Sequence, residues 1–146
     1  MLLTRYVSEE EATGKVKEIY DEIMASRGLA RVPNFWKAIA GNPDYLEVTW
    51  NNLKTVMRPG KLDRVTKEVI AVAVSATNNC DYCLRSHTDA LRAMGLNDEA
   101  ILELMAVVDF FNGSNAVASG LQVAYEPSVP REEPAPAVAA MGTVVE

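Results

Sequence analysis

The stretch from Asp63 to Gly95, "DRVTKEVIAVAVSATNNCDYCLRSHTDALRAMG", contains both cysteines of the 146-residue chain and its only histidine. Its first half is rich in β-branched residues, a composition that buried strands share. An N-capping Asp63, a charged first turn and a length of about 15 residues favour a helix instead. A second helix is expected from about Cys80 to Met94, ending at Gly95. If the two helices fold back on each other, they form an antiparallel hairpin that turns at the "NN" between them.

Cys80, Cys83 and His87 are spaced by three and four residues, so all three side chains fall on one face of the second helix. A free thiol, with a pKa of about 8.5, is mostly protonated at neutral pH. The N-terminus of a helix stabilises the thiolate, and a neighbouring imidazole can accept the proton. Two cysteines three residues apart can close a local disulfide after one of them is oxidised. This spacing favours a thiol redox site.

Glu68 is the candidate group for orienting His87. It stands about ten residues before the turn and His87 about eight after it, an offset of about 3 Å at the rise of an α-helix. A histidine that acts as a base usually needs such a third group. Glu68 also lies in a segment dominated by apolar residues, where a buried carboxylate requires a partner. We expect the two side chains to meet across the hairpin.

Three other interpretations of the cysteines remain open. A purely structural disulfide would close so small a loop that it would remove little chain entropy. A zinc site would need Glu68 as its fourth ligand, since the chain has no second Cys/His pair. The third alternative is that the cysteines and His87 are ordinary core residues. A thioredoxin fold, the usual setting of Cys-x-x-Cys, needs βαβ alternation that this chain lacks, so a helical redox protein is required.

The rest of the chain also shows helical patterning, which predicts an all-α fold. Ser8 and Glu11 have capping-box spacing and are expected to begin an amphipathic helix that ends at Gly28. A short helix is expected in "VPNFWKAIAG". Asn42, followed by proline, should cap a helix that ends before "RPG". Asn97 should cap "DEAILELMAVVDFF", and Ser114 or Asn115 should open a final helix.

Isolated side chains receive simple structural interpretations. We expect Trp36 and Trp50 in the core or in an interface. Phe110 and Phe111 should pack between helices or between subunits. Ser75 is expected to bond to the backbone of its own helix.

Composition limits the class of protein. The length is that of one domain, and 49% of the residues are hydrophobic, enough for a core. A net charge of −6 argues against nucleic acid or anionic lipid as the main partner. No apolar run approaches the roughly 20 residues that span a bilayer, and the start lacks a signal peptide. We expect a cytoplasmic protein without a membrane partner, where a close cysteine pair is more often catalytic or metal-binding than structural.

We divide the chain into a helical domain over residues 1–125 and a tail over residues 126–146. The tail, "EPSVPREEPAPAVAAMGTVVE", is rich in proline and alanine and has no periodicity. Alone it should be extended and mobile. If it is ordered, it lies against a second surface, either a neighbouring subunit or a crystal contact.

The pattern Glu68-x11-Cys80-x2-Cys83-x3-His87, inside "KEVIAVAVSATNNCDYCLRSHTDALRAMG", resembles the signature of the alkylhydroperoxidase AhpD-like proteins, within the wider carboxymuconolactone decarboxylase family. The close resemblance covers about residues 61–121. It implies an all-helical bundle around a central hairpin that carries the Cys-x-x-Cys motif. It also implies a homo-oligomer, commonly a trimer or hexamer, with active sites near subunit contacts.

The resemblance also implies a mechanism of antioxidant defence. Glu68 and His87 would relay a proton from Cys83, which reacts with a hydroperoxide. Cys80 would form the disulfide and exchange it with a thiol or lipoyl-type protein reductant, so no haem, flavin or metal cofactor is needed. The best-known AhpD proteins carry another histidine between the two cysteines, where this chain has "DY". This chain also has one copy of the helical core unit rather than two.

The leading hypothesis is thus a thiol-dependent peroxidase or disulfide oxidoreductase. The alternative is a lactone decarboxylase that uses His87 and Glu68 as acid and base and gives the cysteines no evident task. A third, non-enzymatic hypothesis is a redox-sensing or scaffold oligomer whose disulfide alters assembly.

Overall fold

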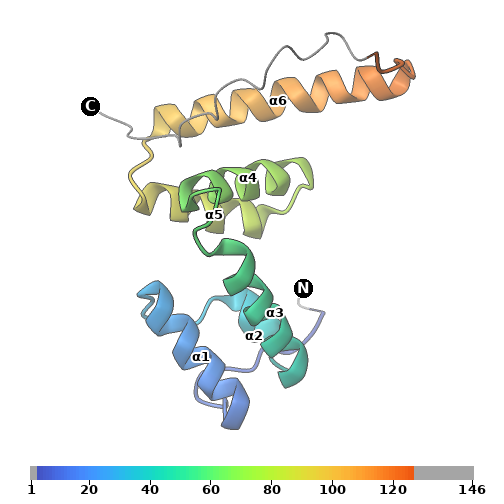
Figure 1. Ribbon diagram of the computed structural model, residues 1–146. Coiled ribbons are helices and arrows are strands. Elements are labelled where there is room, and N and C mark those ends of the chain that lie inside the picture. The colour runs from blue at the N-terminus through green and yellow to red at the C-terminus, as the bar shows by residue number, and fades with distance from the viewer. Residues whose placement is uncertain (1–2, 127–146) are drawn as a thin grey trace. The chain divides into compact units, whose positions relative to one another are not determined.

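The computed structural model describes residues 3–126, and all regular structure in this range is α-helical, as predicted. Figure 1 shows the order of the helices along the chain. The chain divides into two compact units, Met1–Arg58 and Pro59–Glu146, which are described separately below. The proposed domain over residues 1–125 stays a prediction. Residues 127–146 of the tail lie outside the described residues.

The first unit contains α1 (Gly14–Arg27), α2 (Asn34–Ile39) and α3 (Pro43–Met57). One face of α1 is buried, together with residues from α2 and α3 that include Trp36 and Trp50. The buried residues of α1 are Val16, Ile19, Tyr20 and Ile23. The two indole rings meet edge to face with their centroids 5.3 Å apart. Nε1 of Trp50 donates a hydrogen bond to Oε2 of Glu22, 2.8 Å away. The two rings are the largest side chains in the core of this small unit.

The beginning of α1 differs from the prediction. The Ser8–Glu11 capping box does form: the amide of Ser8 donates to Oε2 of Glu11 at 3.1 Å, and the amide of Glu11 donates to Oγ of Ser8 at 3.3 Å. It closes only a turn, because Gly14 has a φ of +50° and interrupts any right-handed helix coming from Ser8. The predicted end was correct, since Gly28 is the left-handed C-cap, with a φ of +61°.

The third helix begins as its sequence predicts. Oδ1 of Asn42 accepts a hydrogen bond from the amide of Tyr45 at 3.1 Å, and proline occupies the first helical position. Leu46 and Trp50, one turn apart, are buried. The helix ends at Met57, before the Pro-Gly pair that follows.

The second unit is built on a hairpin of α4 (Arg64–Thr77) and α5 (Asp81–Ala93), which lie side by side in Figure 1. The β-branched segment is therefore a helix and not a strand. Asn79 makes the turn with a φ of +55°, in the left-handed region that asparagine tolerates better than most residues. The amide of Cys80 then donates to the carbonyl of Ser75 at 3.0 Å, which ties the start of α5 to the end of α4.

The last helix, α6 (Asp98–Gly120), is continuous, so the predicted break near Ser114 is wrong. Asn97 caps its beginning as expected, through the amide of Ala100 at 2.9 Å. Two hydrogen bonds keep the "FNGSN" segment helical. Oγ1 of Thr77 on α4 donates to Oδ1 of Asn112 at 3.1 Å, and Oγ of Ser114 donates to the carbonyl of Phe111 at 3.3 Å. These bonds occupy polar side chains that would otherwise compete for the helix backbone.

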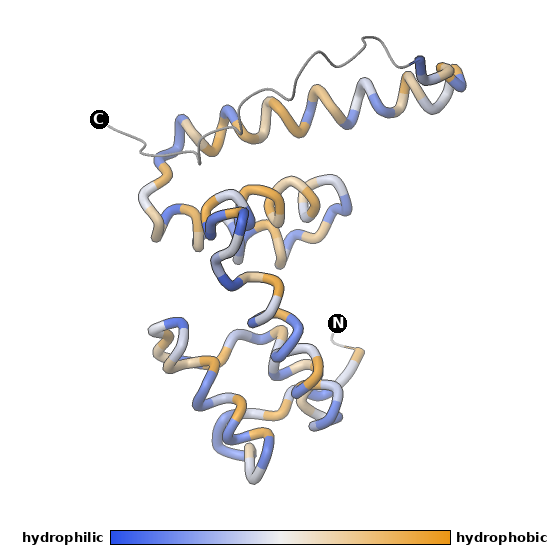
Figure 2. The backbone as a smooth tube through the Cα atoms, viewed as in Figure 1, coloured by the Kyte–Doolittle hydropathy of each residue, from blue (hydrophilic) through white to orange (hydrophobic). Residues whose placement is uncertain are grey.

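By length and composition alone, α6 is long and apolar enough to cross a membrane, with 23 residues and a mean hydropathy of 1.2 over its most apolar window. The prediction that no run approaches this length is wrong in that sense. Figure 2 shows hydrophobic positions recurring along the whole helix. Val108 is the one residue of α6 that is buried. Leu102, Phe110 and Phe111 on the same helix are more than half exposed. The helix contains four acidic residues and no basic ones.

Candidate active site

The two cysteines are joined by a disulfide at the N-terminus of α5, with their Cα atoms 5.3 Å apart. Cys80 is the N-cap residue, and its Sγ accepts a hydrogen bond from the amide of Cys83 at 3.3 Å. Both residues are partly exposed. Both sulfurs therefore lie at the N-terminus of α5, where the positive end of the helix dipole favours a thiolate once the disulfide is reduced.

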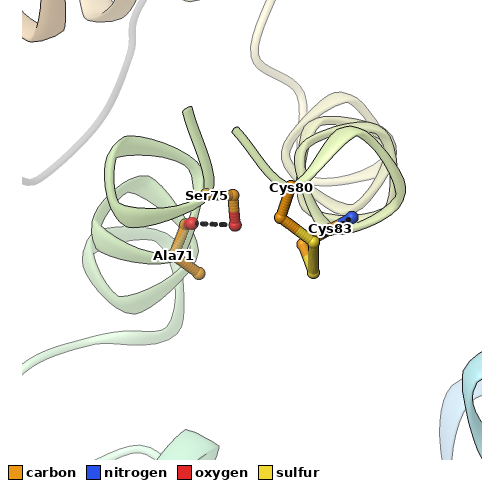
Figure 3. The surroundings of a disulfide bond; sticks show 4 residues. All are labelled: Ala71, Ser75, Cys80 and Cys83. Carbon is orange, nitrogen blue, oxygen red and sulfur yellow. Dashed lines mark hydrogen bonds between the residues drawn. A yellow bond between two sulfur atoms is a disulfide. The ribbon is translucent and has the colours of Figure 1, made fainter. Parts of the chain in front are cut away.

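The end of α4 faces this disulfide. In Figure 3, Ala71 and Ser75 lie on α4, opposite the start of α5 with Cys80 and Cys83. Ser75 is buried, and its Oγ donates to the carbonyl of Ala71 at 2.6 Å, so the expected bond to its own helix is confirmed. Its carbonyl accepts from the amide of Cys80. The carbonyl of Ser75 and the amide of Cys83 thus both hold Cys80 in place.

Glu68 and His87 meet across the hairpin, as the helix-rise argument predicted. Oε2 of Glu68 lies 2.7 Å from Nδ1 of His87. The carboxylate side chain is 2% exposed and the imidazole side chain 27% exposed. The buried acid therefore reaches the interior side of the ring, while part of the ring remains accessible.

Sequence reasoning missed Arg64, which completes this cluster. Its Nε and Nη2 atoms each lie 3.3 Å from Oε1 of Glu68, and its side chain is 44% exposed. The available signal was its spacing, four residues before Glu68 on one helix. The two carboxylate oxygens therefore have different partners, Arg64 for one and His87 for the other.

The surroundings of Glu68 act on its pKa in opposite directions. Burial is the largest influence and by itself would raise the pKa. The hydrogen bond and charge of His87, together with the charge of Arg64, outweigh burial and lower the pKa below its ordinary value of 4.5. The carboxylate is therefore ionised at neutral pH, although it is almost completely buried.

The protonation of the His87 ring follows from this charge. An ionised carboxylate only accepts hydrogen bonds, so Nδ1 must carry a hydrogen and donate it to Glu68. In the neutral ring, Nε2 is then the free base. Cys83 stands one turn before His87 on the same face of α5. The arrangement can accept a proton from a group near the helix N-terminus and stabilise the resulting imidazolium.

Within residues 3–126, no group of three or more His, Cys, Asp or Glu side chains is arranged to hold a metal ion. The two sulfurs are bonded to each other, and Nδ1 of His87 is engaged with Glu68. The zinc interpretation of this cluster therefore gains no support from the described residues.

This fold and cluster define the family. The profile of the carboxymuconolactone decarboxylase family matches residues 43–126, more than half of the chain, and the chain belongs to that family. It is similar to the crystal structure of an alkylhydroperoxidase AhpD core from Rhodospirillum rubrum, with 36% sequence identity and a TM-score of 0.82. That similarity covers 86% of this chain and 95% of the solved one, so the predicted AhpD-like fold is confirmed.

Curated relatives carry related names. An alkyl hydroperoxide reductase of Mycobacterium tuberculosis is 31% identical over 110 residues, which are 75% of this chain and 31% of that protein. The alkyl hydroperoxide reductase AhpD of Rhodococcus erythropolis is 26% identical over 129 residues, covering 80% of this chain and 70% of its own length. The chain thus spans less than a third of the first of these relatives.

Proposed function

We propose that this chain is a thiol-dependent peroxidase and disulfide oxidoreductase of AhpD type that acts in antioxidant defence. The observation that carries the proposal is the hairpin itself. It combines a disulfide-bonded Cys80–Cys83 pair at a helix N-terminus with a His87 ring held by a buried, ionised Glu68. The names of its relatives support the same activity.

The reaction begins from the reduced dithiol. Nε2 of His87 takes the proton of Cys83, and Glu68 stabilises the imidazolium that forms. The Cys83 thiolate attacks one oxygen of the hydroperoxide, the O–O bond breaks, and the leaving alkoxide takes the proton to become an alcohol. Cys83 is now a sulfenic acid. The sulfur of Cys80 attacks it, a disulfide forms and water leaves.

The disulfide in the structure corresponds to the oxidised end of this cycle. Returning to the dithiol needs two electrons, which a thiol or lipoyl-type protein reductant supplies by attacking Cys80. Cys80 is the partner for exchange because it precedes the helix, at its cap, whereas Cys83 lies inside the first turn. The chemistry requires no haem, flavin or metal, and it suits a reducing, cytoplasmic compartment.

The departure from the best-known AhpD proteins lies between the cysteines. Asp81 forms an ion pair with Arg85, and the ring of Tyr82 is 43% exposed. No second histidine stands there, so His87 and Glu68 carry the whole proton transfer in this proposal. We expect slower peroxide turnover than in a site with two histidines. We also expect disulfide exchange with a protein partner as a second activity.

The test is consumption of an alkyl hydroperoxide by the reduced protein in the presence of a dithiol reductant. Wild type should turn over, and Cys80→Ser and Cys83→Ser should lose turnover. The matched control is Ser86→Ala, which changes a hydroxyl on α5 outside the proposed machinery and should retain turnover. Peroxide consumption that is unchanged in both cysteine variants would defeat the proposal.

The alternative is a lactone decarboxylase, favoured by the fact that the Glu68–His87 pair is complete without either sulfur. Such an enzyme would use the pair as acid and base. A variant in which both cysteines are serine discriminates between the two activities. Decarboxylation of a lactone acid that survives this change would support the alternative. Loss of both peroxide consumption and decarboxylation would contradict it.

We further propose that the chain forms a homo-oligomer, a trimer or hexamer, through the exposed face of α6. Large apolar side chains that protrude along this helix include Leu102, Phe110 and Phe111. Contiguous exposed apolar surface of this kind marks contact sites. The occupant is a second copy and not an anionic bilayer, since α6 has acidic residues and no basic ones.

A further inference from the structure

We propose that Arg64 is the positioning residue of the Glu68–His87 pair. By holding Oε1 of Glu68 it directs Oε2 to Nδ1 of His87 and so keeps Nε2 as the free base. This inference rests on the proposed function for the use made of His87. Which nitrogen of the His87 ring carries the proton can nevertheless be measured without any peroxide.

The first support is the division of the carboxylate. Nε and Nη2 of Arg64 both lie 3.3 Å from Oε1, whereas Nδ1 of His87 lies 2.7 Å from Oε2. A carboxylate held at one oxygen has a restricted rotation about its last bond. Its other oxygen is then fixed in the direction of the imidazole across the hairpin.

The second support is that α4 gains nothing from an arginine at this place. Arg64 is the first residue of the helix, where the helix dipole disfavours positive charge. Its order relative to Glu68, cation before anion, is also the less favourable one for an i,i+4 pair on a helix. The position is explained by the buried carboxylate and not by helix stability.

The third support is the permanent charge of the guanidinium. Arg64 from α4 and His87 from α5 are the charged or titratable groups that act on Glu68 among the described residues. α6, which also packs on α4, contributes none there. While His87 is neutral, its Nδ1–H still donates to Glu68, but Arg64 supplies the full positive charge that acts on the carboxylate. Without it, the proton shared by the pair moves toward the carboxylate, and Nδ1 no longer has to be the protonated nitrogen.

The experiment uses nitrogen-15 NMR of the imidazole, which needs no assignment because His87 is the only histidine in the chain. Spectra are compared for wild type, Arg64→Gln, Arg64→Lys and the matched control Arg92→Gln. The control removes an exposed Arg92–Asp98 ion pair from the same unit without touching Glu68. Thermal unfolding checks that all four are folded, and the rate of Cys83 alkylation at neutral pH is measured in a Cys80→Ser background.

We expect wild type and Arg92→Gln to show a ring protonated at Nδ1. Arg64→Gln should show a mixture of the two tautomers and a several-fold slower alkylation of Cys83, and Arg64→Lys should recover most of both. An Arg64→Gln protein with the wild-type tautomer and alkylation rate would overturn the inference. If wild type consumes no peroxide while the tautomer shifts as expected, the proposed function fails and the positioning role stands.

Discussion

Nδ1 of His87 and Oε2 of Glu68 lie 2.7 Å apart, although 19 residues separate them in the sequence. The contact exists because α4 and α5 run antiparallel from a turn held by Asn79, so that residues at similar distances from the turn become neighbours. The proton-accepting part of the site is therefore a property of the hairpin, and its energetics can be tested without substrate.

The stability of the protein should depend on pH through Glu68. Its pKa is lowered in the folded state, so its ionisation stabilises the fold fully above the unfolded pKa of about 4.5, and this contribution is lost as the pH falls through the lowered value. Replacement by Gln should reduce the free energy of unfolding at pH 7 by about 1–3 kcal/mol, because the buried carboxylate is lost and one of its two donors, Arg64 or His87, loses its acceptor. The difference from wild type should shrink as the solution is acidified below that window. Urea unfolding at a series of pH values measures this.

The control for this series is Asp89→Asn at an exposed position of α5, which should follow wild type at every pH. A Glu68→Gln protein whose deficit stays constant from neutral to acid pH would show that ionisation of this carboxylate contributes nothing to stability.

The order of events at the two sulfurs should be visible by mass spectrometry. In Cys80→Ser the attacking thiol is retained and its resolving partner is absent, so peroxide should leave Cys83 as a sulfenic acid, detected as a gain of one oxygen and as an adduct with a dione probe. In Cys83→Ser the remaining thiol should react at least about tenfold more slowly, because Cys80 stands two helical turns before His87 and Cys83 only one. Equal reaction in both variants, or the opposite order, would reverse the roles given to the two residues.

The Trp50–Glu22 hydrogen bond should contribute measurably to the first unit. The indole is 3% exposed, so removing its acceptor with Glu22→Ala leaves a buried N–H without a partner and should cost about 1–2 kcal/mol of unfolding free energy. The control is Glu18→Ala, an exposed position on the same helix, which should change little. A double-mutant cycle with Trp50→Phe isolates the pair, and a coupling energy near zero would contradict the expectation.

Assembly through α6 should respond to a single charge. Phe110 is 66% exposed in the chain, so Phe110→Lys should not disturb the protomer but should prevent close packing of a second copy on that face. Sedimentation equilibrium should show an oligomer for wild type and the mass of one chain for the variant. Tyr45→Lys, at an exposed position of α3, is the control and should sediment as wild type. A wild-type chain that sediments as a monomer would refute the proposed trimer or hexamer.

The pairing of Glu68 with His87 was predictable, because it follows from regular helix geometry once the two helices are taken to fold back on each other. Cap residues at Asp63 and Asn97 bound the helices, and a constant rise per residue places Glu68 opposite His87. These are local rules that tertiary contacts did not override.

The departures came from interactions between segments or from backbone angles. The "NGS" segment predicts a break, but the helix continues through it, and Thr77 on α4 donates a hydrogen bond to Asn112 there. A genuine capping box at Ser8 did not start α1, since Gly14 takes a left-handed conformation. Arg64 was missed because His87 already supplied a partner for the carboxylate of Glu68, and an arginine four residues from a glutamate also suits a simple surface ion pair.

The edge-to-face pair of Trp36 and Trp50 has a practical consequence. These are the only two tryptophans in the chain, and both belong to the Met1–Arg58 unit. Intrinsic indole emission therefore reports the melting of that unit alone and carries no direct signal from the segment that holds the sulfurs. A spectrofluorimeter and a thiol-titration assay would thus follow the two halves of one polypeptide independently, without any label.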